Sequence, residues 1–143
     1  MKRRELLAIS GTMLLSGCGV FDSRVRLGGV RLENFETNSR EVDIRVEKDG
    51  DIVYDETVSI DPPSDTVSTR IIDCTWDTDA ASAYSVAAKL FDRAEWTELA
   101  LDEEGGACQW VSVQCEYGAI HLDSKNCNDY PEIPCDLPSS YSR

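Results

Sequence analysis

The chain has 143 residues and a net charge of −13 at pH 7, from 27 acidic and 14 basic residues. This length is enough for one domain with its own hydrophobic core. The strong negative charge repels the phosphate backbone and therefore excludes nucleic acid as a partner.

The start of the chain has the order of an export signal. Lys2, Arg3 and Arg4 form a basic head, and residues 6–15 follow without a charge. This apolar run is shorter than the roughly 20 residues that a membrane-spanning helix needs, and its order is that of a secretory signal. A buried amino-terminal helix with an incidental cysteine is the alternative, but it does not account for the basic head followed by an apolar run.

Residues 15–18, Leu-Ser-Gly-Cys, resemble the lipobox of bacterial and archaeal lipoproteins at all four positions. The resemblance implies that residues 1–17 are removed and that Cys18 carries a lipid, which anchors the protein on the outer face of the cell membrane. Residues 3–7, Arg-Arg-Glu-Leu-Leu, also resemble a twin-arginine motif, which implies export after folding.

Removal of residues 1–17 takes away three basic residues and one acidic residue. The mature chain then has 126 residues, of which 11 are basic and 26 acidic, and its charge is −15. The acidic residues are spread along the chain. Such a surface is typical of proteins in concentrated salt, where a Debye length of about 3 Å screens carboxylate repulsion. With the signal, this composition resembles small surface lipoproteins of haloarchaea; an acidic tail or a polyanion-like partner surface is the alternative interpretation.

Beyond the signal and a short linker, apolar residues alternate with polar ones, and this period of two predicts strands. Gly28-Gly29 predicts a bulge in the first strand, and Asp49-Gly50 predicts a tight hairpin turn. A helix over the alanine-rich residues 79–89 is the alternative to one strand, but valine and tyrosine interrupt the helical pattern. The expected strands are residues 25–32, 42–46, 52–60, 67–76, 84–90 and 95–101, followed by a hairpin over residues 108–127.

Short strands with a turn every 8–12 residues predict an all-β fold, an antiparallel β-sandwich of about 7–8 strands. The pattern resembles immunoglobulin-like or fibronectin type III-like domains over residues 24–127, without the cysteine and tryptophan signature of antibody domains. We expect a signal (residues 1–17), a lipidated cysteine with a linker (18–23), the sandwich (24–127) and a tail (128–143). Because the linker is so short, the sandwich should lie close to the membrane.

A two-residue turn at Tyr117-Gly118 would fix the register of the last hairpin. It places Cys108 opposite Cys127, and opposed residues have Cα atoms about 4.5–5.5 Å apart, which a disulfide can bridge. The export signal makes disulfides the default, so we predict a Cys108–Cys127 bond. The same register puts Cys115 on the apolar face of the hairpin.

The other cysteines leave two arrangements open. Cys115 is either a buried free thiol or a partner of Cys74. Cys135, in a tail between two prolines, is the preferred partner of Cys74, and this second bond would fix the tail to the domain.

The sequence holds no catalytic or metal-binding pattern, so we expect neither an enzyme nor a cofactor. It has no Cys-x-x-Cys pair and only one histidine, which disfavours a zinc site. His121 is predicted on the outer face opposite Gln114. It would therefore point away from Cys115, which argues against a catalytic Cys–His pair.

Two classes of function remain. The first is a binding or structural module that contacts another exported protein through loops or a sheet edge. The alternative is capture of a small ligand or an ion, by a loop pocket or by an exposed face formed by Trp76, Trp96 and Trp110. Packing of these tryptophans on their own strands, with cation–π contacts to neighbours such as Lys125, is the competing interpretation of the tryptophan face.

Overall fold

The computed structural model of the chain describes residues 24–64 and 67–129. These residues form eight strands and two single-turn 3₁₀ helices. In chain order the elements are β1 (Arg26–Asn34), β2 (Arg40–Lys48), β3 (Asp51–Ile60), β4 (Ser68–Ile71), β5 (Tyr84–Leu90), β6 (Thr97–Ala100), η4 (Glu103–Gly105), β7 (Cys108–Glu116), β8 (Ala119–Asn126) and η5 (Cys127–Asp129).

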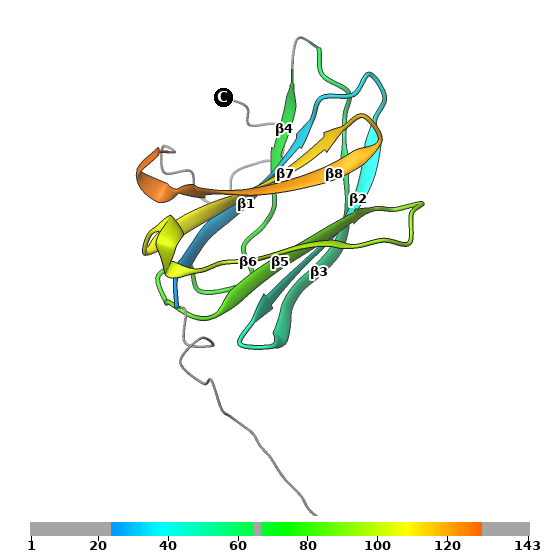
Figure 1. The fold of residues 1–143 in the computed structure, drawn as a ribbon. Helices are drawn as coiled ribbons and strands as arrows, with labels where there is room; N and C mark the ends of the chain where they lie inside the picture. Colours follow the sequence, from blue (N-terminus) through cyan, green and yellow to red (C-terminus); the bar gives the residue numbers. More distant parts are fainter. Residues whose placement is uncertain (1–23, 65–66, 130–143) are drawn as a thin grey trace, which may run out of the picture.

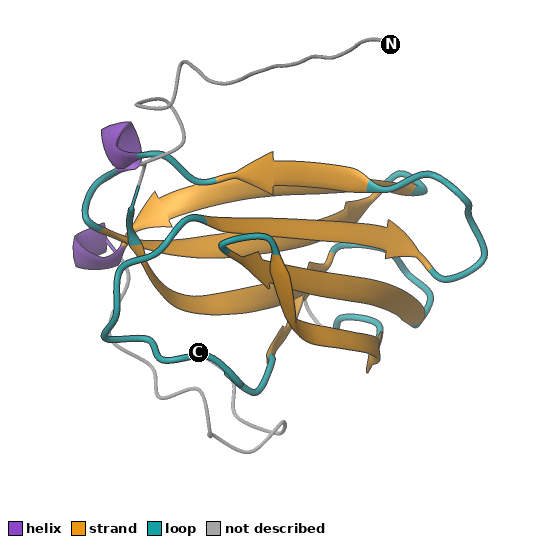
Figure 2. Cartoon of the chain, turned by 90° about the horizontal axis from the view of Figure 1, so that it is seen from below, coloured by secondary structure: helices purple, strands orange, loops and turns teal. Residues whose placement is uncertain are grey.

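The strands form two four-stranded sheets that pack face to face (Figures 1 and 2). One sheet has the order β4-β1-β7-β8, and the other has the order β3-β2-β5-β6. The predicted all-β sandwich is therefore confirmed. One pairing differs from the expected antiparallel arrangement, because β1 and β7 run parallel. Parallel neighbours need a long connection, and here five strands lie between them in the sequence.

The strand order also differs from that of a constant-type immunoglobulin domain, whose sheets are A-B-E-D and C-F-G. Here the first and second strands belong to different sheets, and the first strand pairs with β4 and β7. The likeness to that family is therefore limited to the number and spacing of the strands.

The core lies between the sheets and is built from the inward residues of the alternating pattern. Burial of each valine or leucine side chain contributes about 1.5–3 kcal/mol relative to its exposure to water, so these positions supply most of the stability of the sandwich. The fully buried apolar side chains include Val25, Leu27, Val30, Leu32, Val42, Ile44, Val46, Val86, Val111 and Val113.

β4 is shorter than predicted, because it ends at Ile71 instead of continuing to residue 76. Beyond it, Trp76 enters the core, and its Nε1 donates a hydrogen bond to the carbonyl oxygen of Leu27 at 2.8 Å. The indole N–H thus provides the hydrogen-bond donor for this β1 carbonyl oxygen. The pairing of β4 with β1 does not extend to this point. The following strand, β5, occupies Tyr84–Leu90, so the alternative helix over residues 79–89 is wrong.

Both tight turns form as predicted. Asp49 and Gly50 have φ angles of 53° and 88°, and Tyr117 and Gly118 have φ angles of 56° and 73°. Two successive positive φ angles define a type I′ turn, whose twist matches that of the flanking strands. Every pair in the β7–β8 ladder is the predicted one.

The predicted bulge at Gly28-Gly29 is also present, as a register shift between Leu27 and Gly29 in the β1–β7 pairing. Trp110 packs against both glycines. A Cβ atom placed on Gly29 would lie 2.4 Å from Cη2 of this indole, and one placed on Gly28 would lie 3.0 Å from its Nε1. The ring therefore occupies the space that side chains on β1 would need.

We expect Gly29→Ala to lower the free energy of unfolding by about 1–3 kcal/mol, because the rigid indole of Trp110 cannot yield to the added methyl group without repacking. Gly28→Ala, whose closest contact is longer, should cost less. Denaturant titration in molar KCl measures both. Equal losses would show that the closeness of the contact with Trp110 does not set the cost.

Candidate interaction surface

The two ends of the sandwich differ in what they carry. At one end, called the entry end here, Val25 and Ser82 exchange two backbone hydrogen bonds of 3.0 Å, and the N–H of Asp49 donates to the carbonyl of Ala83 at 2.8 Å. The chain enters the sandwich here at residue 24, and both 3₁₀ helices lie here (Figure 1). The opposite end, here the loop end, consists of residues 35–39, 61–64, 91–96 and 117–118.

Glu36 ties segments of the loop end together. One carboxylate oxygen accepts hydrogen bonds from Arg40, including one from Nε at 2.9 Å. The other oxygen accepts the backbone N–H of Gly118 at 2.8 Å. Burial would raise the pKa of Glu36, but these hydrogen bonds and the charges of Arg40 and Arg93 hold the pKa below its ordinary value of 4.5. The ionised carboxylate thus links the loop after β1 to the β7–β8 turn.

Asn34 makes a second set of links beneath these loops. Its side chain is fully buried. Nδ2 donates to the carbonyl oxygens of Asn38 at 2.8 Å and Asp61 at 3.1 Å. Oδ1 accepts the backbone N–H of Glu36 at 2.9 Å. The loop after β1 and the end of β3 are therefore fixed by one amide.

The β5–β6 turn is held by backbone and side-chain contacts. The N–H of Phe91 donates to the carbonyl of Glu41 at 2.9 Å. Lys89 lies 2.9 Å from Asp43 and donates to the carbonyl of Arg93, also at 2.9 Å. This turn is therefore attached to β2 on one side and closed on itself on the other.

These anchored loops carry exposed aromatic rings. Phe35, Phe91 and Tyr117 are 40%, 56% and 92% exposed. Tyr117 also has the left-handed φ of 56°, which costs an ordinary residue about 1–2 kcal/mol and is usually left to glycine, asparagine or aspartate. A bulky aromatic residue is thus placed in solvent where a small one would fit better.

Sequence reasoning did not single out these three rings, because each lies in a predicted turn. The sequence signal that could have identified them was their aromatic type. Turns favour glycine, proline, asparagine, aspartate and serine, so an aromatic residue in three turns that meet at one end is unusual.

Two hollows lie between the loops of this end. One, of about 210 Å³, is lined by Arg40, Leu90 and Phe91 among others. The second, of about 280 Å³, lies between the β5–β6 and β7–β8 turns, beside Arg93 and Ile120. Both are smaller than the 300–1,000 Å³ or so that small-molecule sites usually have.

The tryptophan face expected as an alternative ligand site does not form. Trp76 and Trp110 are only 8% and 3% exposed, so neither ring is available to a ligand. Trp96 is 37% exposed, but Arg45 and Lys89 lie over its ring, 4.5 and 5.6 Å from the centroid. Packing with cation–π contact is therefore the correct interpretation, with these two cations at Trp96.

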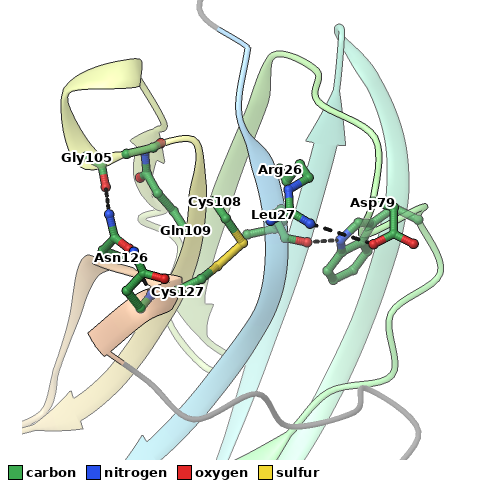
Figure 3. The surroundings of a disulfide bond; sticks show 11 residues. Arg26, Leu27, Asp79, Gly105, Cys108, Gln109, Asn126 and Cys127 are labelled. Carbon is green, nitrogen blue, oxygen red and sulfur yellow. Dashed lines mark hydrogen bonds and ion pairs between the residues drawn. A yellow bond between two sulfur atoms is a disulfide. The ribbon is translucent and has the colours of Figure 1, made fainter.

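Cys108 and Cys127 form a disulfide at the entry end, with Cα atoms 5.4 Å apart, as the hairpin register predicts (Figure 3). Cys115 is a buried free thiol, and burial, with the nearby charge of Glu36, raises its pKa to about 11. A thiol with so high a pKa is inert as a nucleophile.

Cys74 is also disulfide-bonded. Because the other described cysteines are either paired with each other or free, the alternative Cys74–Cys115 bond is wrong. The predicted partner, Cys135, and the predicted lipid carrier, Cys18, lie outside the described residues.

His121 is exposed and lies opposite Gln114, as predicted. Within residues 24–64 and 67–129, no group of three histidine, cysteine, aspartate or glutamate side chains could hold a metal ion. In the same part of the chain, no helix is long and apolar enough to cross a membrane.

No protein family matches the chain, and no curated protein is significantly similar to it.

Glu36→Gln should lower the free energy of unfolding at pH 7 by about 1–2 kcal/mol, because a charge-assisted hydrogen bond is replaced by a neutral one. Since the folded-state pKa of Glu36 is lowered, its contribution is full above pH 4.5 and is lost as the pH falls through the folded-state value. Denaturant titrations between pH 7 and pH 3 should therefore show the two proteins converging in acid. The control is Glu41→Gln, an exposed carboxylate at the same end; a similar loss there would contradict the role of Glu36.

Proposed function

We propose that this protein is a lipid-anchored module of the cell exterior that binds another exported protein through its loop end. One observation carries the proposal. Phe35, Phe91 and Tyr117 are exposed, and the turns that carry them lie at the end of the sandwich opposite residue 24 (Figure 1). Exposed aromatic residues that share one end of a small domain favour protein–protein contact, in which such residues contribute much of the binding energy.

The length of the chain from Cys18 to the loop end is compatible with a domain that displays its loop end near a membrane surface. Arg24 lies six positions after Cys18, with five residues between them, and a chain of that length spans at most about 20 Å. The nine residues of β1 run the length of the sandwich and add about 30 Å. The loop end would therefore work within roughly 50 Å of the membrane surface, and its partner would be a protein that is itself at or near that surface.

The concentrated salt that the composition implies favours apolar contacts with a partner over charged ones. At molar salt the Debye length is about 3 Å, so charge pairs across an interface are weakened. Salts that strengthen the burial of apolar groups strengthen aromatic contacts. In a chain with a mature charge of −15, aromatic rings are thus the contacts that concentrated salt would leave intact.

Cys18→Ser should release the mature protein from the membrane fraction, because the lipid is attached through that thiol. Fractionation of cells, followed by detection of the protein in membrane and medium, measures the shift. Ser23→Ala, in the linker, is the control and should leave the distribution unchanged. A membrane-bound pool that persists in Cys18→Ser would refute the anchor.

The double variant Phe91→Ser and Tyr117→Ser should lower binding of the partner by tenfold or more, since one hot-spot aromatic residue contributes about 2 kcal/mol. The partner is identified by cross-linking in native membranes at molar KCl and quantified by mass spectrometry. Ile52→Ser is the matched control, because Ile52 is 53% exposed but lies in the strand that starts at the entry end. An equal loss in the control, or no stoichiometric partner for the unmodified protein, would overturn the proposal.

A further inference from the structure

One sheet edge of the sandwich is both long and open. Of the strands that the structure describes, β4, β8, β3 and β6 lie at sheet edges (Figure 1). β8 contacts β5 and β6 of the opposite sheet, so the two sheets approach each other on that side. On the other side, β4 has only four residues, whereas β3 has ten. A long edge strand presents unpaired backbone N–H and C=O groups, to which a strand of another chain can pair.

The residue types of β3 suit such pairing. β-Branched and aromatic residues are the types enriched in strands. Six of the ten residues of β3 are of these types, namely Ile52, Val53, Tyr54, Thr57, Val58 and Ile60. The strand is therefore able to pair on its open side as well as with β2, unless something prevents it.

The hydrogen bonds of β2 identify the β3 groups that face the open side. In an antiparallel pair, successive residues point their backbone groups alternately toward the partner strand and away from it. The carbonyl of Glu41, in β2, accepts the N–H of Phe91 and so points toward β5. Ser59 is paired with Glu41, so the N–H and C=O of Ser59 point away from β2. By the same alternation, the backbone groups of Thr57 and Asp55 also face the open edge.

Two side chains from the segment that follows β3 occupy carbonyls of this edge. Nη1 of Arg70, in β4, donates a hydrogen bond to the carbonyl oxygen of Ser59 at 2.6 Å. The hydroxyl of Thr75 donates to the carbonyl oxygen of Val53, a residue that has no opposed partner in the β2–β3 register. A strand that paired along this edge would donate its own N–H groups to these carbonyls, so it would have to displace both side chains.

The acidic residues of β3 protect the same edge only in dilute salt. β3 carries Asp51, Asp55 and Glu56 and no basic residue, so pairing of two copies would bring like charges together, which is destabilising. At molar salt the Debye length is about 3 Å, which is shorter than the roughly 4.8 Å between paired strands. The hydrogen bond from Arg70 to Ser59 joins atoms 2.6 Å apart, within that length, so salt weakens it less.

We propose that the side chains of Arg70 and Thr75 close the β3 edge to a second copy of the chain. Without these two donors, the β3 strands of two copies pair with each other, because a two-fold contact uses the same patch on both chains. The two hydrogen bonds keep the domain monomeric in concentrated salt, where the acidic side chains no longer do so. The proposal is independent of the partner of the loop end, since β3 forms a side of the sandwich.

The first test is the double variant Arg70→Met and Thr75→Val, which removes both donors and keeps most of the apolar bulk. Sedimentation velocity of the purified full chain measures its association at about 0.1 M and about 1 M KCl, where the Debye length is about 10 Å and 3 Å. The unmodified chain should be monomeric at both salt concentrations. The double variant should form dimers, several-fold more tightly at the higher salt.

The matched control is Arg26→Met with Thr97→Val, which removes the same two chemical groups from β1 and β6. The control should stay monomeric. A folded double variant that is monomeric in molar KCl would overturn the proposal, and so would equal association of the control.

Hydrogen exchange at residue resolution shows whether the contact is made by β3. The N–H groups of Asp55 and Thr57 face the open edge in the monomer, so they should exchange rapidly there. In the dimer of the double variant their exchange should slow several-fold. Association that leaves both amides unprotected would place the contact elsewhere and overturn the proposal.

A measurement on the unmodified chain applies even if the double variant fails to fold. A synthetic peptide with the sequence of β3, residues 51–60, is added in molar KCl. Exchange of the Asp55 and Thr57 amides should be unchanged, because the edge is closed. Protection of these amides by the peptide, or an unmodified chain that is already dimeric through β3, would show that the edge is open.

Discussion

The parallel pairing of β1 with β7 is the constraint on which the rest of the molecule depends. Because the two strands run in the same direction, the end of β1 and the end of β7 reach the same end of the sandwich. The N–H of Phe35 then donates to the carbonyl of Cys115 at 3.0 Å, and Glu36 comes within 2.8 Å of the N–H of Gly118. An antiparallel arrangement would separate these loops by the length of a strand. The parallel pair thus creates the loop end and at the same time places the entry of the chain at the opposite end.

The acidic composition has two distinct uses in the fold. A few carboxylates are partly shielded and paired, such as Glu36 with Arg40 and Asp43 with Lys89 and Thr57. Hydrogen bonds hold the pKa values of both carboxylates low against the opposing effect of burial, and shielded pairs are less affected by salt than exposed ones. Many of the other described acidic residues are exposed, and some of these still accept a backbone N–H, as Asp49 and Asp102 do. The same residue type therefore fixes loops at a few positions and sets solubility elsewhere.

Local patterns predicted local structure well and the arrangement of strands poorly. The positions of the strands, the two type I′ turns, the bulge at Gly28-Gly29 and the Cys108–Cys127 bond all follow from alternation and turn chemistry within some twenty neighbouring residues. The order of strands depends on pairings between distant segments, which alternation does not encode, so the parallel pair was missed. The end of β4 was missed for a related reason, since the indole of Trp76 bonds to a strand 49 residues away. The aromatic loop end needed both kinds of information, because only the strand order places the three turns that carry these rings at the same end of the sandwich.

The other surfaces of the sandwich are less suited than the loop end to the proposed binding of a partner. The outer face of β2 and β5 carries paired charges such as Lys89 with Asp43, whose desolvation a partner would have to offset. The edge strand β3 is lined by exposed acidic residues, which oppose pairing with another strand. At the loop end, by contrast, the rings of Phe35 and Tyr117 lie on turns that the side chains of Asn34 and Glu36 already fix. A binding surface ordered before contact loses little conformational entropy when the partner arrives. For the proposed function, the unfavourable φ of Tyr117 belongs to the same arrangement, because the hairpin turn holds that ring in solvent.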